Sequence, residues 1–110
     1  MTTRPLLLLT QEQIEERIKE LDAGWHQDGK AIVRDLTFRS FMETVEFVNR
    51  VAAVAEELDH HPDMTISYRD LKFSISTRYK GGLTVRDFRL AKRIDALLKE
   101  SQISGETSKE

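Results

Sequence analysis

Hydrophobic positions along the chain recur with two different periods, which predict alternating helices and strands. Three stretches carry apolar residues three and four positions apart, as on one face of an α-helix. Each follows a capping-box pattern, in which a Ser or Thr precedes a polar acceptor by three positions. The patterns start at Thr10, Ser40 and Thr84. In the longest helix, about 41–59, the apolar face is expected to hold Phe41, Val45, Val48, Ala52, Ala55 and Leu58.

The ends of two helices can also be placed from the sequence. Pro62 disfavours helical dihedral angles at His61, so the longest helix should end at or just before His60. Gly24 suits the left-handed position that often follows the end of a helix. It is therefore expected to terminate the first helix.

Four shorter stretches alternate apolar and polar residues, as strands with one buried face do. Asp28-Gly29 separates the first two, about 25–27 and 31–38, and predicts a tight hairpin turn, because such turns need a positive φ. Arg34 interrupts the alternation. The other two strands, about 64–68 and 71–78, are expected to meet at a turn near Arg69-Asp70.

This order predicts an α+β fold, α-β-β-α-β-β-α, with a four-stranded antiparallel sheet and three helices packed on one face. Residues 10–100 are expected to form a single domain, after an N-terminal arm (1–9) and before a disordered polar tail (101–110). An exposed edge strand would favour pairing with a second subunit.

Composition excludes several classes of protein. The 110 residues include no Cys, which excludes disulfide scaffolds, Cys-ligated zinc, iron–sulfur clusters and thiol catalysis. The longest apolar run, 6–9, is too short for a membrane span or a signal peptide, which predicts a cytoplasmic protein with no membrane association. The net charge of −2 gives no general attraction to nucleic acid.

Charge is unevenly distributed along the chain. Residues 10–60 hold six Lys and Arg but twelve Asp and Glu, whereas residues 69–99 hold nine and three. This asymmetry can indicate an anionic partner. The favoured interpretation is that the two regions neutralise each other within the fold or across a subunit contact.

Candidate chemistry concentrates where the longest helix ends. Histidine exchanges protons near neutral pH, and His60 and His61 are adjacent there. Glu56, one helical turn before His60, could orient an imidazole and fix its tautomer. Two alternatives stay open at this point. The histidines could merely cap the helix, or they could join Glu56, Asp59 and Asp63 in a metal site, although no zinc-type spacing is present.

These residues belong to a longer pattern. The run Glu56-Glu-Leu-Asp-His60-His61-Pro62 is followed by Tyr68, Ser76-Thr77, Gly82-Leu83-Thr84 and Asp87. It resembles the signature of the pterin-4a-carbinolamine dehydratases, over about residues 10–99. The resemblance implies dehydration of 4a-hydroxytetrahydrobiopterin to quinonoid dihydropterin and water, without a metal or organic cofactor. This reaction recycles the cofactor of the aromatic amino acid hydroxylases. The family forms dimers through sheet pairing and tetramers through helix packing.

The resemblance also implies roles for individual residues. His60 and His61 would be the catalytic pair, supported by Glu56. One would protonate the departing 4a-hydroxyl, and the other would bind or deprotonate the pterin. The implied substrate-binding residues are Asp63, Ser76, Thr77, Arg78 and Asp87.

Arg78 departs from the family pattern, which usually has His at this position and Trp in some bacterial members. Arginine stays protonated and cannot act as a base, but it can bind a pterin electrostatically. The alternative to an enzyme is therefore a catalytically silent binding protein with a protein client. Dehydratase-like RuBisCO assembly chaperones and coactivator-type dimerisation factors are such family members.

Overall fold

The structure, a computed structural model, describes residues 5–101 and contains one antiparallel sheet. Its strand order is β1-β2-β4-β3, formed by β1 (His26–Asp28), β2 (Ala31–Thr37), β3 (Asp63–Ser67) and β4 (Asp70–Ile75). Three α-helices are α1 (Gln11–Ile18), α2 (Phe41–Leu58) and α3 (Val85–Ser101). A short 3-10 helix, η1 (Arg78–Lys80), precedes α3. The predicted α+β fold and the order of its helices and strands are confirmed.

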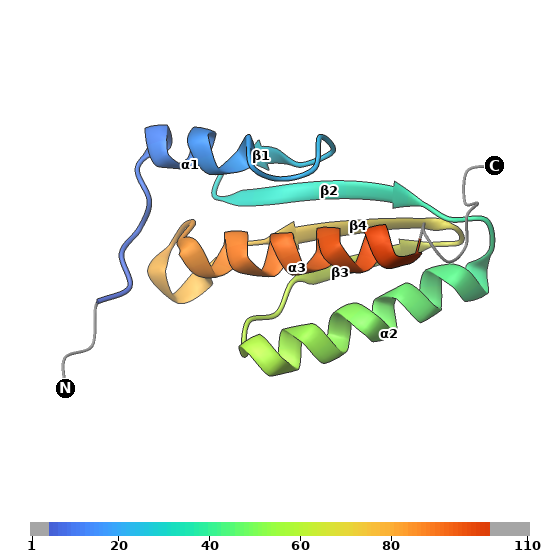
Figure 1. The fold of residues 1–110 in the computed structure, drawn as a ribbon. Coiled ribbons are helices and arrows are strands. Elements are labelled where there is room, and N and C mark those ends of the chain that lie inside the picture. Colours follow the sequence, from blue (N-terminus) through green and yellow to red (C-terminus); the bar gives the residue numbers. More distant parts are fainter. Residues whose placement is uncertain (1–4, 102–110) are drawn as a thin grey trace.

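The hydrophobic core lies between the sheet and its helices. In Figure 1, α3 crosses the middle of the sheet, and α2 runs beside α3 below it. Inward side chains of β2 and β4 meet apolar residues of both helices, which removes nearly all of their surface from water. The most deeply buried members are Ile32, Val51, Phe73, Ile75, Leu90, Ala91 and Ile94.

Both hairpins turn through two residues. Asp28 pairs with Ala31, and Gly29 between them has a φ of 62°, as the predicted tight turn requires. In the second hairpin Ser67 pairs with Asp70, so the turn is 68–69. The sequence placed this turn one residue too late.

The buried face of α2 differs from the predicted one. Phe41 is 48% exposed, and the buried positions are Thr44, Phe47, Val51, Val54 and Ala55. The helix carries apolar residues on two neighbouring faces, so periodicity alone did not separate them. A polar residue can occupy the buried face because the Thr44 hydroxyl donates to the Ser40 carbonyl at 2.9 Å.

Arg34 interrupts the alternation in β2 because it forms a partly buried ion pair. Its guanidinium lies 3.0 Å from Asp95 on α3, which also accepts hydrogen bonds from the Trp25 indole and the Asp22 backbone. Gly24 does not have the predicted left-handed conformation. A Cβ atom at Gly24 would lie 2.8 Å from Arg34 Nε, so this position needs glycine for space instead.

The acidic and basic regions of the sequence meet in the fold. Arg93 of α3 binds Glu57 of α2 at 3.1 Å, and Lys92 binds Glu20 at 3.4 Å. These pairs support the interpretation that the two regions neutralise each other.

Within residues 5–101, no helix has the length and apolar character needed to cross a membrane. Most of the predicted polar tail and residues 1–4 of the predicted arm lie outside the described residues. Ser101, the first residue of that tail, is the last residue of α3. The described part of the arm is attached to the domain by a hydrogen bond from Leu9 N to the Leu83 carbonyl (2.9 Å).

Candidate active site

The end of α2 places two histidines in different surroundings. Asp59 has left-handed dihedral angles (φ 53°, ψ 44°), and His60 N then donates to the Ala55 carbonyl at 3.0 Å. This is the Schellman type of helix ending. It turns the His60 side chain into the protein, where only 7% of the residue stays exposed, and leaves His61 on the surface.

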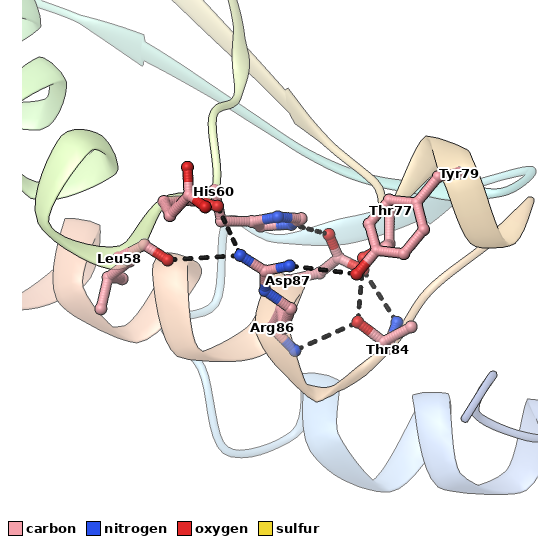
Figure 2. Close-up of polar contacts among 8 residues, drawn as sticks. Leu58, His60, Thr77, Tyr79, Thr84, Arg86 and Asp87 are labelled. Carbon is pink, nitrogen blue, oxygen red and sulfur yellow. Dashed lines mark hydrogen bonds and ion pairs between the residues drawn. The ribbon is translucent and has the colours of Figure 1, made fainter. Parts of the chain in front are cut away.

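His60 is held by a buried chain of hydrogen bonds (Figure 2). Its Nε2 atom lies 2.6 Å from Asp87 Oδ1. Asp87 Oδ2 accepts from Thr77 Oγ1 and from the Thr84 backbone N–H, both at 2.8 Å. The Thr77 hydroxyl lies 2.9 Å from the Thr84 hydroxyl. Since Thr77 has one proton and donates it to Asp87, Thr84 must donate to Thr77.

This chain determines where His60 carries its proton. A carboxylate whose oxygens accept from Thr77 and Thr84 can only accept from the histidine as well, so the Nε2 atom of His60 is protonated. Within residues 5–101, the only buried side-chain N or O atom without a partner is Arg34 Nε. The Nδ1 atom of His60 is therefore not a buried atom without a partner, and His60 is one of the residues that line the cleft described below.

His61 has a carboxylate partner of its own. Its Nε2 atom lies 2.6 Å from Glu56 Oε2, and both side chains are largely exposed. The sequence placed Glu56 beside His60, on the same helical face. That expectation is wrong, because the left-handed turn at Asp59 ends the helix before His60 and directs its ring toward Asp87 instead.

Arg78 lies in the turn between β4 and α3. Because β4 ends at Ile75, Arg78 begins η1, whereas the sequence placed it at the end of a strand. Its guanidinium donates to Asp63 at the start of β3. The hydrogen bond and the negative charge of Asp63 raise the pKa of Arg78, so this side chain stays cationic.

Arg86, on the first turn of α3, joins both sides of the site. One of its nitrogens donates to the Tyr79 hydroxyl at 3.1 Å. The other donates to the carbonyls of Leu58 (3.3 Å) and Asp59 at the end of α2. A cation at this position also interacts favourably with the negative end of the helix dipole.

These groups surround an open cleft of about 420 Å³, a size that suits a small molecule. Five of the predicted site residues line it, namely His60, His61, Ser76, Thr77 and Arg78. Three more residues, Asp59, Tyr79 and Arg86, also line it. The sequence analysis gave Asp59 only a possible role as a metal ligand and gave Tyr79 and Arg86 no site role, because only the folded turns bring these last two to the histidines.

The remaining predicted residues lie outside the lining of the cleft. Glu56 and Asp63 are exposed and contact lining residues, His61 and Arg78 respectively. Asp87, predicted to bind substrate, is fully buried and does not line the cleft. It contacts two residues that do, His60 and Thr77. Among residues 5–101, no three His, Asp or Glu side chains converge as metal ligands would.

Comparison with known proteins identifies a family. Residues 7–97 match the family model described as Pterin 4 alpha carbinolamine dehydratase. Relatives named "Putative pterin-4-alpha-carbinolamine dehydratase" include one from Sulfolobus acidocaldarius, 36% identical over 89 residues (81% of this chain and 97% of the relative). Another, from Thermomicrobium roseum, is 46% identical over 74 residues (67% of this chain and 80% of the relative).

Two solved structures share the fold. A transcriptional coactivator/pterin dehydratase from Brucella melitensis is 30% identical, with a TM-score of 0.79 over 83% of this chain and 98% of that one. A pterin dehydratase-like protein, identified as a RuBisCO assembly factor in the alpha-carboxysome, is 22% identical, with a TM-score of 0.54 over 66% and 84%. The second likeness concerns the fold alone. The family model and the relatives show that this chain belongs to the pterin-4-alpha-carbinolamine dehydratase family.

Proposed function

We propose that this protein dehydrates 4a-hydroxytetrahydrobiopterin to quinonoid dihydropterin and water. The observation that carries the proposal is a pair of adjacent imidazoles at one cleft, each with a carboxylate on its Nε2 atom. In this reaction the C4a–O bond breaks, the hydroxyl leaves with an added proton as water, and the pterin loses one proton. Two imidazoles that exchange protons near neutral pH meet both needs.

His60 is the general acid–base in this mechanism. The protonated Nε2 atom of His60 donates to Asp87, so Nδ1 is the atom that exchanges a proton with the substrate. His61, which is more exposed, binds the pterin or transfers the second proton, and Glu56 orients its ring. Neither step requires a metal or an organic cofactor.

Arg78 contributes binding and not proton transfer, because arginine does not deprotonate in proteins. It lines the cleft with Ser76, and Asp63 holds its guanidinium in place. A cation thus lines the cleft at the position where the family usually has a histidine. General acid–base help from one group is typically worth about 10²–10⁴-fold, so the absence of a third histidine is compatible with turnover.

We also propose that the protein forms a homodimer or homotetramer. Within the described residues β3 is an edge strand, and most of its residues are exposed. A second copy could pair with this edge. Light scattering coupled to size-exclusion chromatography measures the mass directly, and a monomer would contradict this assignment.

A direct dehydratase assay tests the function. An aromatic amino acid hydroxylase generates the carbinolamine, and its disappearance is followed by ultraviolet absorbance with and without this protein. We expect wild type to accelerate the loss and His60→Ala to abolish the acceleration. Arg78→His serves as the matched variant that restores the usual family residue.

The variants separate the two functions that the sequence left open. If wild type is inactive and Arg78→His gains activity, the fold has been kept for binding, and a protein client should be sought by pull-down. Acceleration that survives in His60→Ala would mean that the acid–base assignment is wrong.

A further inference from the structure

One residue of the cleft has no part in the proposed chemistry. Tyr79 lies in η1 and lines the same cleft as His60. It is 70% exposed, more than any other large hydrophobic side chain in residues 5–101. A large aromatic ring left in water beside a small-molecule cleft has apolar surface available for a ligand.

The turn that carries Tyr79 is closed by backbone hydrogen bonds. Lys80 N and Gly81 N donate to the Thr77 carbonyl at 2.9 and 3.1 Å. Thr77 N donates to the Gly82 carbonyl at 2.9 Å, and Gly81 supplies the positive φ of 79° that the turn needs. Thr77 is itself anchored to Asp87. The backbone of Tyr79 is therefore held in position before any ligand binds.

The far end of the Tyr79 side chain is also held. Its hydroxyl accepts a hydrogen bond from Arg86, whose other nitrogen donates to the carbonyls of Leu58 and Asp59 (Figure 2). Arg86 forms no ion pair with a carboxylate among the described residues. Its donors instead connect the turn with the end of α2, which carries the histidines. The two sides of the cleft are thereby linked.

We propose that the ring of Tyr79 is an aromatic wall of the substrate cleft, against which the planar guanidine and amide part of the pterin packs, and that Arg86 is the positioning residue that holds this ring. This inference rests on the proposed function. Stacking between aromatic side chains and planar heterocycles is favourable and does not depend on particular hydrogen bonds. A ring that is already fixed loses little conformational freedom on binding, which strengthens the interaction. Tyr79 thus favours substrates that carry a planar conjugated part, such as the guanidine and amide atoms of a pterin.

The kinetics of two substitutions test whether the Tyr79 ring contributes to substrate binding. Tyr79→Leu removes the ring, and we expect KM to rise by about fivefold or more with kcat within about twofold, because stacking affects ground state and transition state alike. Tyr79→Phe keeps the ring and loses the hydrogen bond by which Arg86 holds it, so KM should rise by about two- to threefold, less than in Tyr79→Leu. The control is Tyr68→Leu, at an equally exposed Tyr (67%) that does not line the cleft. An unchanged KM in Tyr79→Leu, or a fall in kcat alone, would overturn the proposal.

Calorimetric titration with 7,8-dihydrobiopterin separates this inference from the proposed function, because it needs no turnover. If Tyr79→Leu binds more weakly than wild type and Tyr68→Leu, the result supports the role of the Tyr79 ring in binding, even in a protein without dehydratase activity. If all three proteins bind equally well, Tyr79 does not contribute to binding, even if wild type is an active dehydratase. No binding by wild type rejects this role as well.

Discussion

Replacing Asp87 with Asn changes one atom of a fully buried side chain and should reverse the position of the proton on His60. The Thr77 hydroxyl and the Thr84 backbone N–H both donate to Asp87 Oδ2, so they retain an oxygen at that position in Asp87→Asn. The amide NH2 group then faces His60 Nε2. Two donors cannot face each other, so Nε2 must become the acceptor and the proton must move to Nδ1.

The expected loss of stability in Asp87→Asn follows from the hydrogen bonds that change. Asp87 accepts three hydrogen bonds, at 2.6, 2.8 and 2.8 Å. A hydrogen bond to a charged group stabilises by about 1 kcal/mol more than one between neutral groups, so the free energy of unfolding should fall by about 2–3 kcal/mol. If the Nδ1 atom of His60 can no longer accept a proton, the rate should fall by about 10²–10⁴-fold.

Three measurements follow this change. Urea unfolding gives the loss of stability, the dehydratase assay gives the loss of rate, and nitrogen NMR of the imidazole shows which nitrogen carries the proton. Glu56→Gln is the matched control, because it makes the same replacement at the exposed partner of His61. We expect it to leave the tautomer of His60 unchanged and to alter stability little, as exposed pairs contribute little.

Two results would refute the reasoning. If Asp87→Asn carries the proton on Nδ1 and still turns over at the wild-type rate, the tautomer of His60 does not matter for the reaction. If the proton stays on Nε2, the hydrogen-bond chain does not determine it.

Two further predictions concern stability. Thr77→Val removes the hydroxyl that links Thr84 to Asp87 while keeping the size of the side chain, so the free energy of unfolding should fall by about 2–4 kcal/mol in urea titrations. Thr77→Ser should stay close to wild type, and a valine variant of wild-type stability would contradict the bonding pattern. At Asp95, burial raises the pKa, although hydrogen bonds from Asp22 and Trp25 oppose it. The Asp95 carboxyl therefore binds a proton more readily in the folded protein than in the unfolded chain. At neutral pH its buried charge lowers the free energy of unfolding. This loss is removed as the pH falls through the raised pKa toward about 4, the value of an unperturbed Asp. Wild type should gain stability relative to Asp95→Asn over that range in unfolding experiments at a series of pH values, whereas a constant difference would exclude a raised pKa.

Local patterns in the sequence predicted the helices and strands well, because the contacts that define them are local. The capping box at Thr10 is complete in both directions, and Gly29 makes the tight turn that it predicts. At Ser40 only half of the box forms. The Ser40 hydroxyl accepts from Glu43 N, but the Glu43 carboxylate binds Arg39. A competing partner one residue away is enough to redirect such a side chain.

The sequence predicted part of the membership of the candidate site but not which carboxylate pairs with each histidine. His60 and His61 were recognisable from the pattern, whereas the partner of each depends on the left-handed conformation of Asp59, which no periodicity indicates. Asp87 reaches His60 across 27 residues of sequence. Contacts of that kind arise only when α3 packs against the end of α2.

The buried Asp95 has a consequence for how the chain folds during synthesis. The groups it binds, at Asp22, Trp25 and Arg34, lie 73, 70 and 61 residues earlier in the sequence. These three groups, of which only Arg34 lies in the first hairpin, are therefore synthesised well before the carboxylate that binds them. Contacts of such long range close large loops and slow folding. This domain should acquire its structure as one unit, after translation of α3, and not from its N-terminus onward.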